Sequence, residues 1–171
     1  MSAKKMATTA LLALIITACD TSDDGLSYTV PDNICGIPAD KKVLESLLDD
    51  GNKFEQSTGH FSLQEGQFCH MYVDENDSVI SDAAWHQSRY NLSDYFLTYD
   101  VEGLRYLREG EVASWNNGIV ALIKCPGVSK KGDILTVEVS DMRWNKKSQE
   151  LLERLAPSYF NAYKEKLGCR S

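Results

Sequence analysis

Two β-rich runs flank Asn116-Asn117-Gly118, and this arrangement constrains the fold more than any other feature of the 171-residue chain. An Asn-Gly pair between two such runs is the strongest short-range signal of a tight β-hairpin. The later run 134–140 alternates, with Leu135, Val137 and Val139 on one side. Strands joined by hairpin-length connections form an antiparallel sheet. We therefore predict such a sheet in the second half of the chain.

The preceding part of the chain predicts three more strands. Residues 54–77 contain two of them, and the second is clearer because apolar and mixed side chains alternate: Cys69, Met71 and Val73 on one face, and Phe68, His70 and Tyr72 on the other. The polar run 74–77 is typical of a turn. A third strand is expected at 78–87, paired with the second.

Residues 35–51 have the pattern of a short N-terminal helix. Its apolar face, at helical spacing, consists of Val43, Leu44, Leu47 and Leu48. Pro38 suits a first helical turn, Asp40 is an alternative cap, and Gly51 marks the end. A second short helix is expected at 101–108.

The last element, residues 146–169, predicts a long helix. Its apolar stripe includes Leu152, Leu155 and Tyr159, Pro157 is expected to kink or split it, and Gly168 closes it. A sheet with helices before and after it must bury one face under them. We therefore predict an α+β fold of two layers, an antiparallel β-sheet packed against an N-terminal helix and a long C-terminal helix.

The first 18 residues have the order of an export signal. Lys4 and Lys5 precede an apolar run, 6–18, which is shorter than the roughly 20 residues that a membrane-spanning helix needs. This order is typical of a secretory signal peptide. We expect residues 1–18 to be removed and everything after them to lie outside the cytoplasm.

The end of that run, Ile16-Thr17-Ala18-Cys19, resembles the lipobox of bacterial lipoproteins. The resemblance implies that Cys19 receives a lipid with at least two acyl chains, enough for stable anchoring in the bilayer. The alternative is an ordinary signal peptide with a chance cysteine. Residues 19–33 are polar and acidic, and are expected to be a lipidated flexible tether. A single domain is expected over 34–171.

Four cysteines remain when Cys19 is assigned to the lipid. In an oxidising compartment they predict two disulfides, with three connectivities open. Cys35–Cys69 and Cys125–Cys169 are favoured because each joins a helix end to a strand and the loops do not interleave. A metal site is disfavoured, since no Cys-x-x-Cys pair is present and no histidine lies at ligand spacing.

The chain is acidic, with 18 Lys and Arg against 25 Asp and Glu. Removing residues 1–18 takes away Lys4 and Lys5 and no acid, which leaves 16 against 25, a formal charge of −9. Such a charge excludes the basic footprint that binding to nucleic acid requires. It is also unsuited to docking flat on anionic headgroups. Plain solubility is one interpretation, and an acidic surface for a basic partner or a cation is the other.

No catalytic motif stands out in the sequence. It lacks a nucleophile elbow, a phosphate loop, a zinc-protease motif and a dinucleotide fingerprint, so we expect no cofactor and no enzymatic activity. His60, His70 and His86 each stand alone and are interpreted as solvent-facing or hydrogen-bonded. Asp74-x-Asn76-x-Ser78 lacks the glycine and glutamate of a calcium loop and is interpreted as a solvated turn.

Aromatic residues gather in the segment with the weakest secondary-structure pattern, residues 85–106. Tyrosine and tryptophan give contact area at little entropic cost, so such segments often line binding surfaces. The candidate binding residues are Trp85, Tyr90, Tyr95, Phe96 and Tyr99. The alternative is that these side chains fill a core under a loop.

Several features together resemble small uncharacterised lipoproteins exported by high-GC Gram-positive bacteria. They are the lipobox, the acidic tether, YTVPDNICGIP before a helix, FCHMYVD on an early strand, and GIVALIKCPG before a late alternating strand. The resemblance implies a location and a disulfide framework, and it brings no reaction.

The sequence therefore predicts a lipid-anchored module on the extracytoplasmic face of the cell membrane, which binds a ligand or assists a protein partner. The alternative is an acidic inhibitor or immunity-type module against a basic secreted enzyme. An enzyme with an unrecognised site and a purely structural envelope protein are weaker interpretations.

Overall fold

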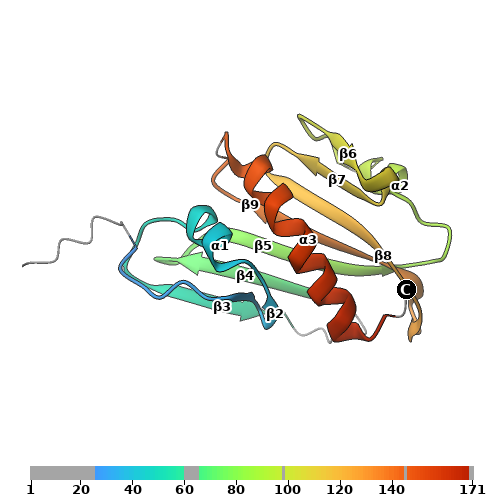
Figure 1. Cartoon of the computed structure of the whole chain (residues 1–171), viewed down its shortest axis with the longest axis horizontal. Coiled ribbons are helices and arrows are strands. Elements are labelled where there is room, and N and C mark those ends of the chain that lie inside the picture. Colours follow the sequence, from blue (N-terminus) through green and yellow to red (C-terminus); the bar gives the residue numbers. More distant parts are fainter. Residues whose placement is uncertain (1–25, 60–65, 98, 145, 170–171) are drawn as a thin grey trace, which may run out of the picture.

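The computed structural model describes residues 26–59, 66–97, 99–144 and 146–169. In this part of the chain the protein is a mixed α+β fold, with a seven-stranded antiparallel sheet and three α-helices, one of them C-terminal (Figure 1). The predicted fold class is thus confirmed at the level of an antiparallel sheet combined with helices.

The sheet contains β3 (Phe54–Thr58), β4 (Gln67–Val73), β5 (Asn76–His86), β6 (Arg105–Leu107), β7 (Val112–Trp115), β8 (Gly118–Ser129) and β9 (Gly132–Asp141). The helices are α1 (Lys41–Leu47), α2 (Leu92–Phe96) and α3 (Ser148–Leu167), and β1 (Asn33–Ile34) pairs with β2 (Ile37–Pro38) in a separate two-stranded sheet. The strand order is β3-β4-β5-β9-β8-β7-β6, so the long strands β5, β9 and β8 form its centre.

The predicted hairpin is confirmed. Trp115 pairs with Gly118, so Asn116 and Asn117 alone make the turn between β7 and β8. The strand after this turn, β8, does not end at Cys125 to Gly127, although a Pro-Gly pair commonly breaks a strand. β8 continues to Ser129 through a register shift, because a bulge absorbs Pro126 without ending the pairing with β9.

The expectation of a helix at 101–108 is wrong. Residues Arg105–Leu107 form the edge strand β6, paired with β7. The helix of this region lies earlier, because Asn91 caps it. The Asn91 side chain accepts from the backbone N–H groups of Ser93 and Asp94, and the Asp94 carboxylate accepts from the Asn91 N–H, a capping box that starts α2.

The helix within 35–51 is shorter than expected. Asp40 is its cap, accepting hydrogen bonds from the backbone N–H groups of Lys42 and Val43, and α1 ends at Leu47, before Gly51. Pro38 lies in β2 instead of the first helical turn. The chain turns between β1 and β2 at Cys35 and Gly36, which both have left-handed backbone conformations.

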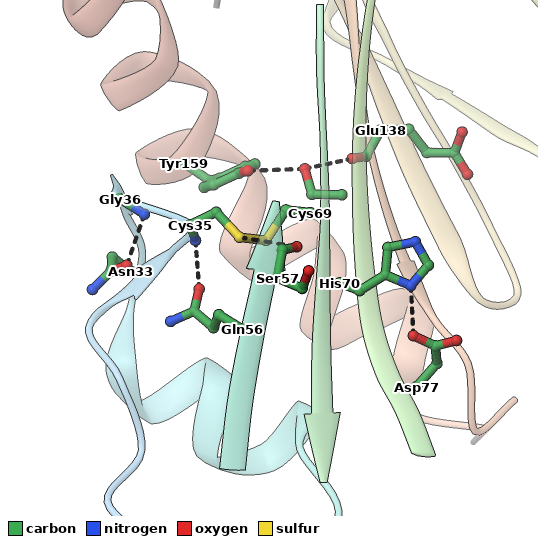
Figure 2. Close-up of a disulfide and its surroundings, with 11 residues drawn as sticks. Asn33, Cys35, Gly36, Gln56, Ser57, Cys69, His70, Asp77, Glu138 and Tyr159 are labelled. Atoms are coloured by element: carbon green, nitrogen blue, oxygen red, sulfur yellow. Dashed lines mark hydrogen bonds and ion pairs between the residues drawn. A yellow bond between two sulfur atoms is a disulfide. The ribbon is translucent and has the colours of Figure 1, made fainter. Parts of the chain in front are cut away.

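The main core lies between the sheet and α3, which crosses it as one continuous helix despite Pro157 (Figure 1). Leu152, Leu155 and Tyr159 of the predicted stripe are buried. The Tyr159 hydroxyl lies 2.9 Å from Ser81 Oγ, and Ser81 Oγ donates to the Glu138 carbonyl at 3.0 Å (Figure 2). The Ser81 hydroxyl has a single hydrogen, so Tyr159 donates to Ser81. These two hydrogen bonds tie α3 to β5 and β9.

Residues 26–33, which the sequence analysis placed in the tether, pack on the domain. Val30 is buried, and Leu26 and Tyr28 lie against the main core. The Tyr28 hydroxyl donates to the Asp49 carbonyl at 2.6 Å. Burial, and next the negative charge of Asp49, raise the pKa of Tyr28 to about 12, so this donor stays protonated at neutral pH.

The structure contains the two disulfides Cys35–Cys69 and Cys125–Cys169, the pairing that the sequence favoured. Cys35 lies in the β1–β2 turn, not at a helix end, and is joined to β4. Cys169 follows α3 and is joined to β8. The bridges therefore fasten the β1–β2 turn and the residue after α3 to the sheet.

We predict that replacing Cys125 and Cys169 together by serine lowers the free energy of unfolding by about 4 kcal/mol. The bridge closes a loop of 44 residues, whose entropy the unfolded chain regains when the bridge is lost. Urea unfolding of the variant and the native protein measures the difference. The Cys35→Ser, Cys69→Ser pair, with a loop of 34 residues, should cost about as much, and unchanged midpoints in both variants would contradict the account.

Candidate functional site

The two faces of the central sheet have different characters. On β9, Leu135, Val137 and Val139 belong to the core under α3, whereas Thr136 and Glu138 alternate with them and lie on the other face. Figure 2 shows the side chains of His70 and Glu138 on the opposite side of the strands from Tyr159 and the Cys35–Cys69 disulfide. Polar side chains are thus collected on the face away from α3.

A second, smaller core covers part of that face. Its buried members come from α2 and from the strands beneath it: Leu92, Tyr95, Ala113, Trp115 and Val120. Phe96 packs edge-on against Trp115 with ring centroids 5.8 Å apart. This packing fixes α2 on the sheet, and it leaves the middle of the face uncovered.

Two adjoining cavities occupy the uncovered part. One has a volume of about 320 Å³ and reaches Asp82 and His86 on β5, and the other has a volume of about 510 Å³ and reaches Trp144. Both are lined by Tyr95, Tyr99 and Glu138, so we describe them together as the groove. Volumes of this size are typical of pockets that bind small molecules or single side chains.

Glu138 lies where the two cavities meet, and both of its carboxylate oxygens are held. Oε2 accepts a hydrogen bond from the Tyr95 hydroxyl, and Oε1 accepts one from Ser140 Oγ at 2.7 Å. Burial, and next the charge of Glu138, raise the pKa of Tyr95 far above its ordinary value, so Tyr95 remains a donor at any physiological pH. The carboxylate is therefore fixed in one orientation.

His86 and Tyr90 form one wall of the groove. Their rings are stacked, with centroids 3.7 Å apart and planes 8° from parallel. Thr136 Oγ1 donates to the Ala84 carbonyl at 3.1 Å, so His86 Nε2, 2.9 Å away, donates to Thr136. Burial lowers the pKa of His86, which keeps the imidazole neutral at pH 7. The wall is thus aromatic and uncharged.

Asp82 adds a second carboxylate to the β5 side of the groove. Burial against the groove walls raises its pKa, the charge of Glu138 raises it further, and His70 opposes both effects. Asp82 and Glu138 occupy paired positions of β5 and β9, so the folded protein carries two neighbouring carboxylates that repel each other.

Two exposed aromatic side chains border the cavity on the Trp144 side. Tyr99 has 53% of its surface exposed and Trp144 has 70%. Trp144 also has a left-handed backbone conformation, with φ of 53°, which is rare for a bulky residue and is retained only where neighbouring contacts enforce it.

Those contacts come from Arg143 and Asp141. The Arg143 guanidinium donates hydrogen bonds to two backbone carbonyls at the end of α1, that of Leu48 at 3.2 Å and that of Ser46 at 2.9 Å. Arg143 Nε also donates to Asp141 Oδ1 at 3.2 Å. The buried Asp141 carboxylate also accepts from Ser148 Oγ at the start of α3, at 2.6 Å. These bonds hold the chain on one side of Trp144, and the Trp144 side chain lines the cavity.

Three of the five predicted binding residues come together in the groove, namely Tyr90, Tyr95 and Tyr99. The other two do not. Trp85 is only 9% exposed and belongs to the main core, and Phe96 lies in the smaller core under α2. These two side chains pack against the cores and do not line the groove, although Trp85 also lines two neighbouring cavities. Cys19 and His60 lie outside the described residues.

Four groove residues were not predicted from the sequence, namely Asp82, His86, Thr136 and Glu138. The signal for two of them was present, because the alternation in 134–140 that assigned Leu135, Val137 and Val139 to the core also places Thr136 and Glu138 on the opposite face. No pattern indicated that α2 would leave this stretch of the face uncovered.

Outside the groove, the described part of the chain has few clusters of side chains that could bind a ligand or a metal ion. His70 Nδ1 lies 2.6 Å from Asp77 Oδ1, outside the groove. Within residues 26–59, 66–97, 99–144 and 146–169 no three His, Cys, Asp or Glu side chains are grouped to hold a metal ion, and no helix is long and apolar enough to cross a membrane. The chain matches no protein family model, no curated protein and no solved structure.

We predict that the stability of the Asp82→Asn variant, measured against that of the native protein, increases as the pH rises. Because the folded state raises the pKa of Asp82, it binds the proton more tightly than the unfolded chain does, and native stability falls as the pH rises from the ordinary value of 3.8 through the raised value. The variant escapes this loss. Urea unfolding of both proteins between about pH 3 and pH 8 measures the difference.

The Glu138→Gln background provides the control. There the advantage of Asp82→Asn should shrink, since one source of the raised pKa has been removed. A stability difference that is independent of pH, or that grows toward acid, would show that Asp82 does not have the environment described.

Proposed function

We propose that the protein is a lipid-anchored binding module on the extracytoplasmic face of the cell membrane. The signal-like residues 1–18, the lipobox ending at Cys19 and a domain fastened by two disulfides support this proposal. Disulfides persist in oxidising compartments outside the cytoplasm. In this account the lipid on Cys19 holds the protein at the bilayer, and the α+β domain presents its ligand site to the exterior.

The observation that carries the binding role is the groove on the face away from α3. It combines rigid tyrosine walls, a carboxylate held in one orientation and two exposed aromatic rings at its border. Aromatic side chains dominate binding energy because they bury a large area with few rotatable bonds. A site assembled from sheet strands and held by packing loses little entropy when a ligand binds.

A photo-crosslinking amino acid at position 99 tests the binding role in cells that make the full chain. We expect position 99, at the border of the groove, to give a discrete crosslinked product. The same amino acid at Glu45, which is exposed on α1 on the opposite side, is the matched control and should not give that product. Identical products from both positions, or none from position 99, would count against the groove as the binding site.

The anchor has its own readout in the same cells. The native chain should incorporate a palmitate analogue and remain with the membranes after washing at high salt, and Cys19→Ala should lose both properties. A crosslinked product that is a basic secreted enzyme, with lower activity in the complex, would favour the inhibitor or immunity-type role, for which the acidic groove is the supporting observation.

A further inference from the structure

We infer that the groove selects a positively charged group, a guanidinium or an amine carried by an arginine or lysine side chain or by a free polyamine. This inference rests on the proposed function, because it names the ligand chemistry of the same site. The juxtaposition that carries it is an oriented carboxylate, Glu138, between aromatic walls at the centre of the groove.

The charges around Glu138 all have one sign. Asp82, Asp100 and Glu102 also line the groove, and among its described lining residues there is no lysine or arginine. His86 contributes no compensating charge, since its burial keeps it neutral. An anionic ligand would meet four carboxylates, whereas a cation would be attracted by all of them.

The hydrogen bonds of Glu138 leave room for a ligand. An ionised carboxylate has about four acceptor directions, and Tyr95 and Ser140 use one on each oxygen. A guanidinium or ammonium can donate to the remaining directions in charge-assisted bonds, which are about twice as strong as neutral ones. The existing bonds hold the carboxylate ready, so little reorganisation is needed when the cation arrives.

The aromatic rings suit the same ligand. A cation above an aromatic face is attracted by the negative charge of the ring face, and both arginine and lysine stems pack well on tyrosine and tryptophan. Tyr95 and Tyr99 lie with ring centroids 5.0 Å apart beside Glu138, and Trp144 borders the same cavity. Arg143 and Asp141 hold the chain next to Trp144, so the backbone that carries this ring is fixed at the border of the groove.

Calorimetry on the full chain in an uncharged detergent tests the inference. The probes are the acetylated and amidated peptide Gly-Arg-Gly-Arg-Gly, its counterpart with citrulline in place of arginine, and spermidine. Citrulline has nearly the shape of arginine without its charge. We expect the arginine peptide to bind at least about tenfold more tightly than the citrulline peptide, since a charge-assisted bond contributes more than 1.4 kcal/mol.

Two variants with the same change in net charge locate the effect. Glu138→Gln keeps the shape of the side chain and should weaken binding of the arginine peptide about tenfold. Glu45→Gln, on the exposed face of α1, should leave the affinity unchanged. Tighter binding of spermidine than of the peptide identifies a free polyamine as the source of the charge, and the reverse identifies a protein side chain.

Three results would overturn the inference: no binding by either cationic probe, equal affinity for the arginine and citrulline peptides, or equal effects of the two variants. Binding of a neutral oligosaccharide such as cellotetraose that is insensitive to Glu138→Gln would replace it by glycan recognition. In each of these cases a discrete crosslink from position 99 would still support the proposed binding role, so the two failures can be told apart.

Discussion

The alternation of side chains along the paired strands β5 and β9 is the constraint on which the rest of the structure depends. Glu138 shows how tightly the two faces are coupled: its carbonyl accepts from Ser81, which in turn accepts from Tyr159 of α3, while its carboxylate lies in the groove. A slip of one residue in this pairing would turn Glu138 toward α3 and Val137 or Val139 toward the groove. The buried core and the candidate site therefore specify each other.

The contacts on the α3 face also give the groove its rigidity. Arg143 joins the end of α1 to Asp141, Asp141 accepts from the start of α3, and the two disulfides fasten the β1–β2 turn and the C-terminal residues to the sheet. A site whose walls are held in this way depends on shape and charge that exist before the ligand arrives. Such a site suits recognition, which is the role that we propose together with lipid anchoring at Cys19.

The sequence predicted those strands, turns and helices that depend on residues close together in the chain. The Asn-Asn-Gly turn, the alternation around Cys69 and the long C-terminal helix were found because turn chemistry and periodicity depend on neighbours in the chain. The helix expected at 101–108 was wrong because the segment pairs with β7, a contact that no local pattern reveals. Composition alone pointed to the aromatic segment that supplies Tyr90, Tyr95 and Tyr99 to the groove. Composition does not distinguish an aromatic ring in a groove from one in a core, so it did not reveal that Trp85 and Phe96 pack against the cores.

Chemical-shift mapping tests the central claim most directly, that ligand recognition belongs to the face away from α3. The isotope-labelled full chain is titrated with the arginine peptide, and the backbone amides and tryptophan indoles are followed. The account predicts shifts at Tyr99, Ser140 and the Trp144 indole, with Leu152 and Leu155 of α3 unchanged. Shifts concentrated on α3 or α1, with the groove silent, would contradict it.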